Sequence, residues 1–485
     1  MQIRLKNIGI VRDSMIKLDG LTIITGKNNS GKTTVGKTIY SLFDAVANIQ
    51  RKAENDKLIY IMRHLYNLDE TLEFLRYCRA SFRGDNAGIF APYPALKKVV
   101  NREFRREGSL EAMEKFLYDL IDELKTLDVL PFVEQVKASK SSRIYGVKAS
   151  DIQSNGINVL FNRQKEQSIV LLEKIAADIH KDPDLIDYAR ESINQTLRIE
   201  FCNQIQPVRG QAGKSEIELV DDDDKAYFHF SIEDNQIVND GTPVFTISPC
   251  KKVYLVDDPF ILDEMSTSRY FGGHVIEERE SFFNPDRIRT HNSKLKFVLR
   301  SGKQLSVFEQ TVLSNALKET KSKIDSILPG TFEFSSDGEF YIQDGLKLRI
   351  PNLATGSKMF SIIKMLLDKG EIDDTTMLIL DEPEAHLHPQ WQNAFAEIIV
   401  LLVKELNVNV LLTTHSPNFM LAIDAYMRKY EIAEKTNFYQ TNFLGNGFVD
   451  YQCVNDDLGL IYQDFLQYLS EVKMLRNKYL RNIEE

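Results

Sequence analysis

The chain has 485 residues, of which 43% are hydrophobic and 27% charged, and its formal net charge is −10. This length is too great for one hydrophobic core and sufficient for two or three subdomains. The acidic balance excludes a global field that would draw the protein onto DNA or an anionic membrane. No apolar run approaches the roughly 20 residues of a membrane span. The four cysteines lie far apart, so we expect a cytoplasmic protein with reduced thiols and no membrane partner.

The first 50 residues predict half of a nucleotide-binding domain. Residues 21–25 (LTIIT) form an apolar run typical of a buried strand, and apolar residues at helical spacing follow from Val35 onward. Between strand and helix stands GKNNSGKTT, residues 26–34, which matches the pattern GxxxxGK[ST]. A chance match is rare, and the strand–loop–helix context makes it rarer.

This loop has the chemistry of a phosphate cradle. Its glycines let backbone N–H groups turn inward at the N-terminus of a helix, whose dipole favours anions. We expect Lys32 to reach the β- and γ-phosphates and the Thr33 hydroxyl to bind Mg²⁺. The predicted nucleotide-binding residues are Gly26, Lys27, Asn28, Asn29, Ser30, Gly31, Lys32, Thr33 and Thr34.

Helical and β-rich segments alternate along the rest of the chain. From Leu110 to Leu127, apolar residues recur in steps of three and four, which fits a short coiled coil or a core helix of a small bundle. Pro131 and Pro183 argue against a long coiled-coil arm. The predicted parts are an N-terminal lobe (1–50), a helical insertion (51–195), a β-rich part (196–275), a second helical insertion (276–328), a C-terminal lobe (329–450) and a helical tail (451–485).

The C-terminal lobe supplies the acids that a phosphate cradle needs. Its alternating strands and helices imply parallel β–α units. The apolar strand 377–380 is followed directly by Asp381 and Glu382. We expect Asp381 to hold Mg²⁺ through water and Glu382 to polarise the attacking water. Because ligands of open α/β sheets bind at the carboxyl ends of strands, the acids and the loop should meet there.

Three histidines lie close to these acids. His415 follows the predicted strand 408–413 and is expected to contact the γ-phosphate, as a second catalytic residue beside Glu382. His386 and His388 stand two residues apart without a nearby cysteine, which is a poor pattern for zinc. A contact loop between subunits is the preferred interpretation of these two.

Together these motifs resemble the ABC/SMC-type ATPase superfamily, and within it the stand-alone OLD/RecF-like ATPases of the AAA type. The resemblance rests on four separated stretches: IITGKNNSGKTT, NLATGSKMFSIIKML, LILDEPEAHLHPQWQ and LLTTHSPNF. It implies an α/β fold, an ABC/SMC-like P-loop ATPase head with helical insertions. It also implies ATP and Mg²⁺ as cofactors, and ATP hydrolysis as the activity.

The second stretch resembles the ABC signature, which in the family caps the γ-phosphate bound to the other protomer. Thr355 replaces the family's first glycine, and Ser357 replaces its usual Glu or Gln. Glu384 and His386 occupy the D-loop, which crosses the dimer interface. The resemblance therefore implies a homodimer, or a higher even oligomer, formed head to head around ATP. The implied signature residues are Ala354, Thr355, Gly356, Ser357 and Lys358.

The Q-loop residue stays open at this level. Gln204 and Gln206 are candidates by residue type, whereas Asp257 and Asp258 are candidates by their position after a strand.

Three functions remain open. The resemblance to the ATPase subunits of Septu, PARIS and retron-associated anti-phage systems implies a sensor or scaffold subunit that controls a separately encoded effector, a nuclease. A RecF-like DNA-repair or DNA-end-binding ATPase would contact double-stranded DNA, with basic clusters in 97–106 and 287–303 as candidates; solvated helix faces explain these clusters equally well. An ATP-binding scaffold with little turnover is the third, because Thr355 and Ser357 depart from the family pattern.

Overall fold

The computed structural model describes residues 1–57, 60–61, 64, 110–126, 156–208, 213–221, 226–238, 248–265, 290–300, 305–335 and 337–481. The chain divides into two compact units. The main unit comprises Met1–Ile49 and Leu185–Glu485, and the second comprises Gln50–Asp184. Among the helices within these described ranges, none is both long and apolar enough to cross a membrane.

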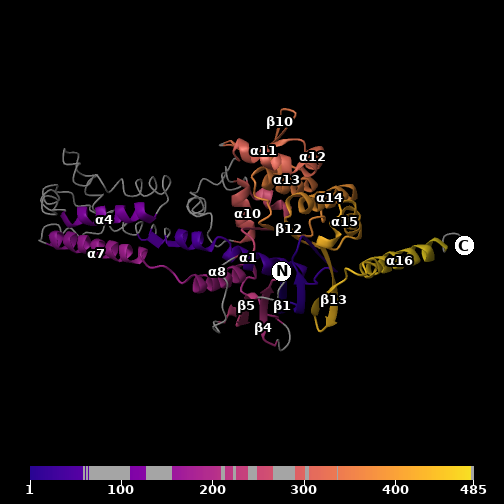
Figure 1. The fold of residues 1–485 in the computed structure, drawn as a ribbon, viewed down its shortest axis with the longest axis horizontal. Helices are drawn as coiled ribbons and strands as arrows, with labels where there is room; N and C mark the ends of the chain where they lie inside the picture. Colours follow the sequence, from indigo (N-terminus) through magenta and orange to yellow (C-terminus); the bar gives the residue numbers. More distant parts are fainter. Residues whose placement is uncertain are drawn as a thin grey trace. The chain divides into compact units, whose positions relative to one another are not determined.

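The main unit is built on a large mixed sheet (Figure 1). Its strands are β1 (Gln2–Ile8), β2 (Val11–Lys17), β3 (Leu21–Thr25), β4 (Ser215–Val220), β5 (Ala226–Glu233), β6 (Gln236–Ile237), β7 (Lys252–Val256), β11 (Thr376–Asp381), β12 (Asn409–Thr414), β13 (Thr436–Gly445) and β14 (Phe448–Cys453). The strand order is β6-β5-β4-β1-β2-β14-β13-β3-β12-β11-β7. The five strands from β13 to β7 run parallel, while β1, β2, β4, β5 and β6 pair antiparallel.

Strand β3 lies between β13 and β12 in the parallel part. All of its residues are buried, as a continuous apolar run predicts for a strand covered on both faces. Leu21 lies opposite Val410 of β12 and Thr436 of β13. The two ends of the chain therefore meet in one sheet, as the separation of the motifs required.

Helices cover both faces of the parallel strands. On β11, Ile379 packs into the same core cluster as Phe43, whereas Leu378 and Leu380 pack into the cluster that contains Phe395. This alternation follows from the two-residue period of a strand. The helices concerned are α1 (Lys32–Val46) and α8 (Leu185–Glu200) in the first cluster, and α13 (Thr355–Asp368), α14 (Pro389–Leu406) and α15 (Pro417–Lys429) in the second. The predicted α/β class is confirmed.

The predicted second insertion is part of the main unit. Leu295, Leu299 and Ile324 pack into the same core cluster as Phe395, so this region does not form a separate module. Its described helices are α10 (His291–Arg300), α11 (Val307–Ala316) and α12 (Lys318–Ile327). The short helix η1 (Pro259–Met265) precedes it, and a three-stranded sheet of β8 (Thr331–Ser335), β9 (Gly338–Gln343) and β10 (Leu346–Arg349) and then η3 (Ile350–Asn352) follow it.

The second unit contains an antiparallel helix pair, α4 (Leu110–Thr126) and α7 (Gly156–Ile179). Ion pairs fix their direction, because Glu114 contacts His180 while Lys125 contacts Glu173. The α4 leucines Leu117, Leu120 and Leu124 are buried, which supports the core-helix interpretation of the three–four spacing. The predicted insertion ended inside α8, but α8 packs on α1 in the main unit.

The C-terminal end of the chain also differs in detail from the prediction. Residue 451 lies within β14, so the predicted tail begins inside a sheet strand rather than after it. The helical tail itself is present as α16 (Gly459–Arg481).

Candidate functional site

The glycine-rich loop lies between β3 and α1, and its two pattern glycines have no room for a side chain. Gly31 is the N-cap of α1 and has a φ of 76°, a left-handed conformation that glycine adopts without strain. A Cβ atom on Gly26 would lie 2.1 Å from the hydroxyl oxygen of Thr441. Both pattern glycines are therefore required by the backbone and by its neighbours.

Lys32 points back over this loop from the first turn of α1. Its Nζ donates to the carbonyl oxygens of Gly26 (3.0 Å) and Lys27 (2.9 Å) and lies 3.1 Å from Glu382 Oε1. Only 4% of the Lys32 side chain is exposed. A buried ammonium held by carbonyls at the N-terminus of a helix is a site for anionic oxygens.

The β13–β14 hairpin supports the loop, a contact that the sequence did not reveal. The Thr441 hydroxyl donates to the carbonyl oxygen of Thr25 (2.9 Å), and the Tyr451 hydroxyl donates to that of Ser30 (2.9 Å). Burial raises the pKa of the Tyr451 phenol, so it remains a donor at neutral pH. The hairpin thus holds both ends of the Gly26–Ser30 segment.

Strand β11 brings the two predicted acids to the loop. Thr33 Oγ1 donates to Asp381 Oδ2 at 2.5 Å, and the hydroxyl of Thr413 donates to the other Asp381 oxygen. Glu382 has a φ of 49°, a left-handed conformation that is strained for a non-glycine residue. Its backbone N–H donates to Thr413 Oγ1 (3.0 Å), which stabilises this turn of the chain.

The donor set fits Mg²⁺ better than a fully protein-bound metal. The described residues include no group of three or more His, Cys, Asp or Glu placed to hold a metal ion. Thr33 and Asp381 already share a hydrogen bond, so one hydroxyl and one carboxylate face the same point beside the loop. Mg²⁺ is commonly held by one or two such ligands, with phosphate oxygens and water completing its shell.

His415 follows β12 and faces the second acid. Its Nδ1 lies 3.1 Å from Glu382 Oε2, and 40% of its side chain is exposed. Glu384 holds the backbone at His415, because Glu384 Oε1 accepts from the His415 backbone N–H (3.3 Å) and from the Thr414 hydroxyl. Burial raises the pKa of Glu384.

Glu384 was assigned to a D-loop that crosses a dimer interface, but the structure buries it within the fold. It is 1% exposed, so its side chain is not available to a second copy. His386 is exposed, and its ring meets that of Phe260 at 5.3 Å. Of the two residues predicted for the D-loop, His386 alone presents a surface side chain.

The signature-like segment forms the N-terminus of α13, which begins at Thr355 after the exposed residue Ala354. A Cβ on Gly356 would lie 3.1 Å from ring atoms of Trp391, so the glycine gives space to the tryptophan. Lys358 is buried, and its Nζ lies 2.5 Å from Asp263 Oδ1. The small residues are thus accessible, but Lys358 is occupied within the fold.

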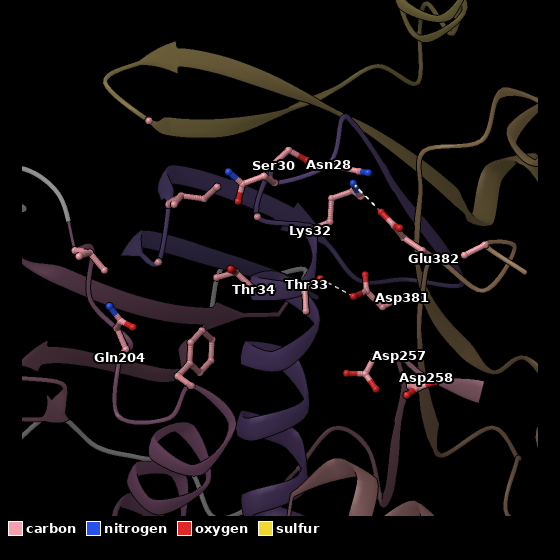
Figure 2. A pocket seen from close by; sticks show the side chains of 18 of the residues that line it. Asn28, Ser30, Lys32, Thr33, Thr34, Gln204, Asp257, Asp258, Asp381 and Glu382 are labelled. Carbon is pink, nitrogen blue, oxygen red and sulfur yellow. Dashed lines mark hydrogen bonds and ion pairs between the residues drawn. The ribbon is translucent and has the colours of Figure 1, made fainter. Parts of the chain in front are cut away.

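A cavity of about 1070 Å³ is lined by Lys32, Thr33, Asp381 and Glu382. In Figure 2, Lys32 and Thr33 face Glu382 and Asp381, while Gln204 stands on a different wall. The lining residues that matter here are Asn28, Asn29, Ser30, Gly31, Thr34, Gln204, Gln206, Asp257, Asp258 and His386. Pockets of this size accept ligands as large as a nucleotide.

The four Q-loop candidates all line this cavity but differ in exposure and in the hydrogen bonds that their side chains make within the fold. The Gln206 amide donates to Ser215 Oγ and the Ile232 carbonyl oxygen and accepts from the Asn235 backbone, so it is occupied. Gln204 is exposed. Asp258 Oδ1 accepts from the backbone N–H of Phe260.

The basic clusters gain little support as a DNA surface. Lys294 pairs with Asp44, and Lys296 pairs with Glu264. Burial lowers the pKa of Lys296. Arg300, the third described member of this cluster, lies 3.8 Å from Glu339 Oε1. The cluster in 97–106 and positions 287, 289 and 303 lie outside the described residues.

Comparison with models of protein families finds one match, which covers part of this site. Residues 285–420 match a family model described as AAA ATPase domain. This segment is similar to the ATPase domains of that family. It contains the signature-like helix, Asp381, Glu382 and His415 but not the glycine-rich loop, and it spans well under half of the chain. A search of curated proteins gives no match.

Solved structures were also compared. The chain resembles an SMC head domain from Thermotoga maritima at 10% identity and a TM-score of 0.35, covering 93% of this chain and 98% of that one. An SMC head domain with coiled coil and joint from Pyrococcus yayanosii gives 12% identity and a TM-score of 0.33, covering 97% and 99%. Scores this low add nothing to what the strand order and the site geometry show.

Proposed function

We propose that the protein binds ATP with Mg²⁺ in this cavity and hydrolyses it. One observation supports this above all: the loop residues Lys32 and Thr33 directly contact Glu382 and Asp381, although most of the chain separates them. A buried ammonium, a hydroxyl–carboxylate pair and a strained acid at one strand edge are the parts that phosphoryl transfer to water needs.

Each residue has a separable role. Lys32 exchanges the carboxylate of Glu382 and the loop carbonyls for phosphate oxygens. Thr33 and Asp381 hold Mg²⁺, which when bound neutralises phosphate charge. Glu382 orients the attacking water and accepts its proton. His415, whose backbone N–H is fixed by Glu384, lies close enough to Glu382 to contact the same phosphate or to stabilise the carboxylate.

Loss of Lys32 tests the binding step. Lys32→Ala should abolish binding of a fluorescent ATP analogue, because the only ammonium in contact with the loop carbonyls, within the described part of the chain, is removed. Lys347→Ala is the matched control, since Lys347 pairs with Glu333 in the three-stranded sheet and both side chains are partly exposed. Retained affinity in Lys32→Ala would overturn the proposed function.

We further propose a head-to-head homodimer, or a higher even oligomer, in which Thr355–Ser357 of one protomer cap the nucleotide of the other. The accessible N-terminus of α13 supports this, because its backbone N–H groups favour anions. Ser357→Tyr should prevent ATP-dependent dimerisation, measured by light scattering, while leaving nucleotide binding unchanged. If Ser357→Tyr dimerises in the presence of ATP as much as the wild type does, this arrangement is contradicted.

The resemblance to anti-phage ATPases supports a proposal for the cellular role: a sensor or scaffold subunit that controls a separately encoded nuclease. This predicts that purification from the native operon recovers a neighbour-encoded protein. Recovery of this chain alone would count against it. The DNA-repair alternative predicts duplex binding with a steep salt dependence; the ion pairs of Lys294 and Lys296 weaken that alternative.

A scaffold with slow turnover is favoured by one specific observation. Lys358, the cation of the signature-like segment, is buried against Asp263 and is not available to a partner's phosphate. Near-zero turnover by both the wild type and Glu382→Gln would support this alternative.

A further inference from the structure

A buried histidine stands between two carboxylates beside the cavity. His291 is the first residue of α10, and its Nδ1 lies 2.6 Å from Oε2 of Glu200, the last residue of α8. Its Nε2 lies 3.0 Å from Oδ2 of Asp257, which follows β7. The backbone N–H of His291 also donates to Glu200 Oε1 at 2.8 Å. Three segments distant in sequence therefore converge on one imidazole.

The two carboxylates favour the charged form of this histidine. Both ring nitrogens face carboxylate oxygens, and only imidazolium can donate from both. Burial alone lowers the pKa of His291, but hydrogen bonds to Asp257 and Glu200 raise it to about 9. The His291 and Glu200 side chains are 6% and 2% exposed, so this charge pair is largely shielded from water.

The cluster connects two walls of the nucleotide cavity. Asp257 and Gln204 both line the cavity and stand on different sides of it in Figure 2, and Gln204 follows Glu200 closely in the chain. Helix α1 also contacts this cluster, because Lys37 Nζ donates to the Glu200 carbonyl oxygen at 3.3 Å. Loss of His291 would therefore remove the contact that joins the segments carrying Gln204 and Asp257.

We propose that His291 is a positioning residue for nucleotide binding, which fixes the cavity walls bearing Gln204 and Asp257 by holding Glu200 and Asp257 together. This inference rests on the proposed function, since it concerns the same cavity. A purely structural role would change thermal stability without changing the affinity of the folded protein for nucleotide.

The test compares His291→Gln with His180→Gln. His180 is a matched control, because it also pairs with a glutamate, Glu114 at 3.0 Å, but in the second unit. We expect His291→Gln to lower kcat/KM for ATP about 10-fold to 100-fold at a temperature where it is fully folded, since small displacements of positioned groups have effects of this order. Wild-type kinetics in folded His291→Gln would overturn the proposal.

A second variant keeps the proposal testable if His291→Gln does not fold. Asp257→Asn preserves the shape and leaves the Glu200–His291 pair in place. If His291 acts through Asp257, the double variant should be no worse than the more impaired single variant, whereas independent roles would give additive losses. Should His291→Gln fail to fold, Asp257→Asn alone must lower kcat/KM, and an unchanged value would overturn the proposal.

The pH profile provides a further readout. The titratable groups that face the cluster are Glu200, Asp257, Lys37, Tyr40, Lys294 and Asp44. Wild-type affinity for ATP should fall as pH rises through about 9, where His291 loses its proton, and His291→Gln should lack that step. If Lys32→Ala binds ATP normally, the proposed function fails; if Lys32→Ala fails to bind but His291→Gln behaves as wild type, this inference alone fails.

Discussion

Replacement of Glu382 by Gln separates the chemical step from nucleotide binding. Glutamine has the same shape, and the backbone N–H of residue 382 can still donate to Thr413 Oγ1. The substitution removes the negative charge that faces Lys32 and His415, each at 3.1 Å. A group that accepts a proton from water contributes about 100-fold to 10,000-fold to a rate. We therefore expect kcat for ATP hydrolysis to fall by about that factor.

The affinity for ATP should rise in Glu382→Gln, whereas kcat should fall. Without nucleotide, Lys32 is paired with Glu382, whose side chain is 30% exposed. An ion pair with one partly solvated partner is worth about 1 kcal/mol or less. Its loss releases Lys32 for phosphate oxygens, so ATP affinity should rise by up to about fivefold.

The assay measures steady-state phosphate release and equilibrium binding of a fluorescent ATP analogue in the same preparation. Glu333→Gln is the control, because Glu333 pairs with Lys347 at 2.9 Å and neither residue lines the cavity. Unchanged turnover in Glu382→Gln, with measurable wild-type turnover, would refute the assignment of Glu382 as the base. A tenfold loss of ATP affinity would refute the competition between Glu382 and phosphate for Lys32.

Three other predictions concern the fold around the site. Gly26→Ala places a Cβ 2.1 Å from a hydroxyl oxygen and should lower the free energy of unfolding by about 1–3 kcal/mol, measured by urea titration; an unchanged value would contradict the close contact with Thr441. Phe360→Ala removes a ring that is 1% exposed and should destabilise by about 3–5 kcal/mol in the same assay, and a loss below 1 kcal/mol would contradict the core assignment. Although burial raises it, ion pairs with lysines hold the pKa of Glu397 at about 2, below the ordinary 4.5; its stabilising contribution is therefore present above pH 4.5 and lost as pH falls toward 2. Glu397→Gln should consequently show a smaller loss of stability between pH 6 and pH 3 than the wild type, and parallel curves would refute this.

The sequence alone determined the local parts of the site. The apolar run before Gly26 and the apolar helix face after Thr34 place the loop between a strand and a helix, because hydrophobic periodicity is a local property of the chain. In the same way, residues 377–380 predicted that Asp381 and Glu382 stand at a strand's carboxyl end. Strand β11 confirms that position.

Tertiary structure alone decided which residues support these parts. The β13–β14 contacts to Thr25 and Ser30, the burial of Glu384 beneath His415 and the convergence of Glu200 and Asp257 on His291 join residues far apart in the chain. No local pattern encodes such contacts, because they depend on the order of the strands and the packing of helices on the sheet. Glu384 shows the difference most clearly. The resemblance to the ATPase superfamily assigned it to a loop at a dimer interface, whereas the structure buries the Glu384 carboxylate, which accepts from the backbone N–H of His415.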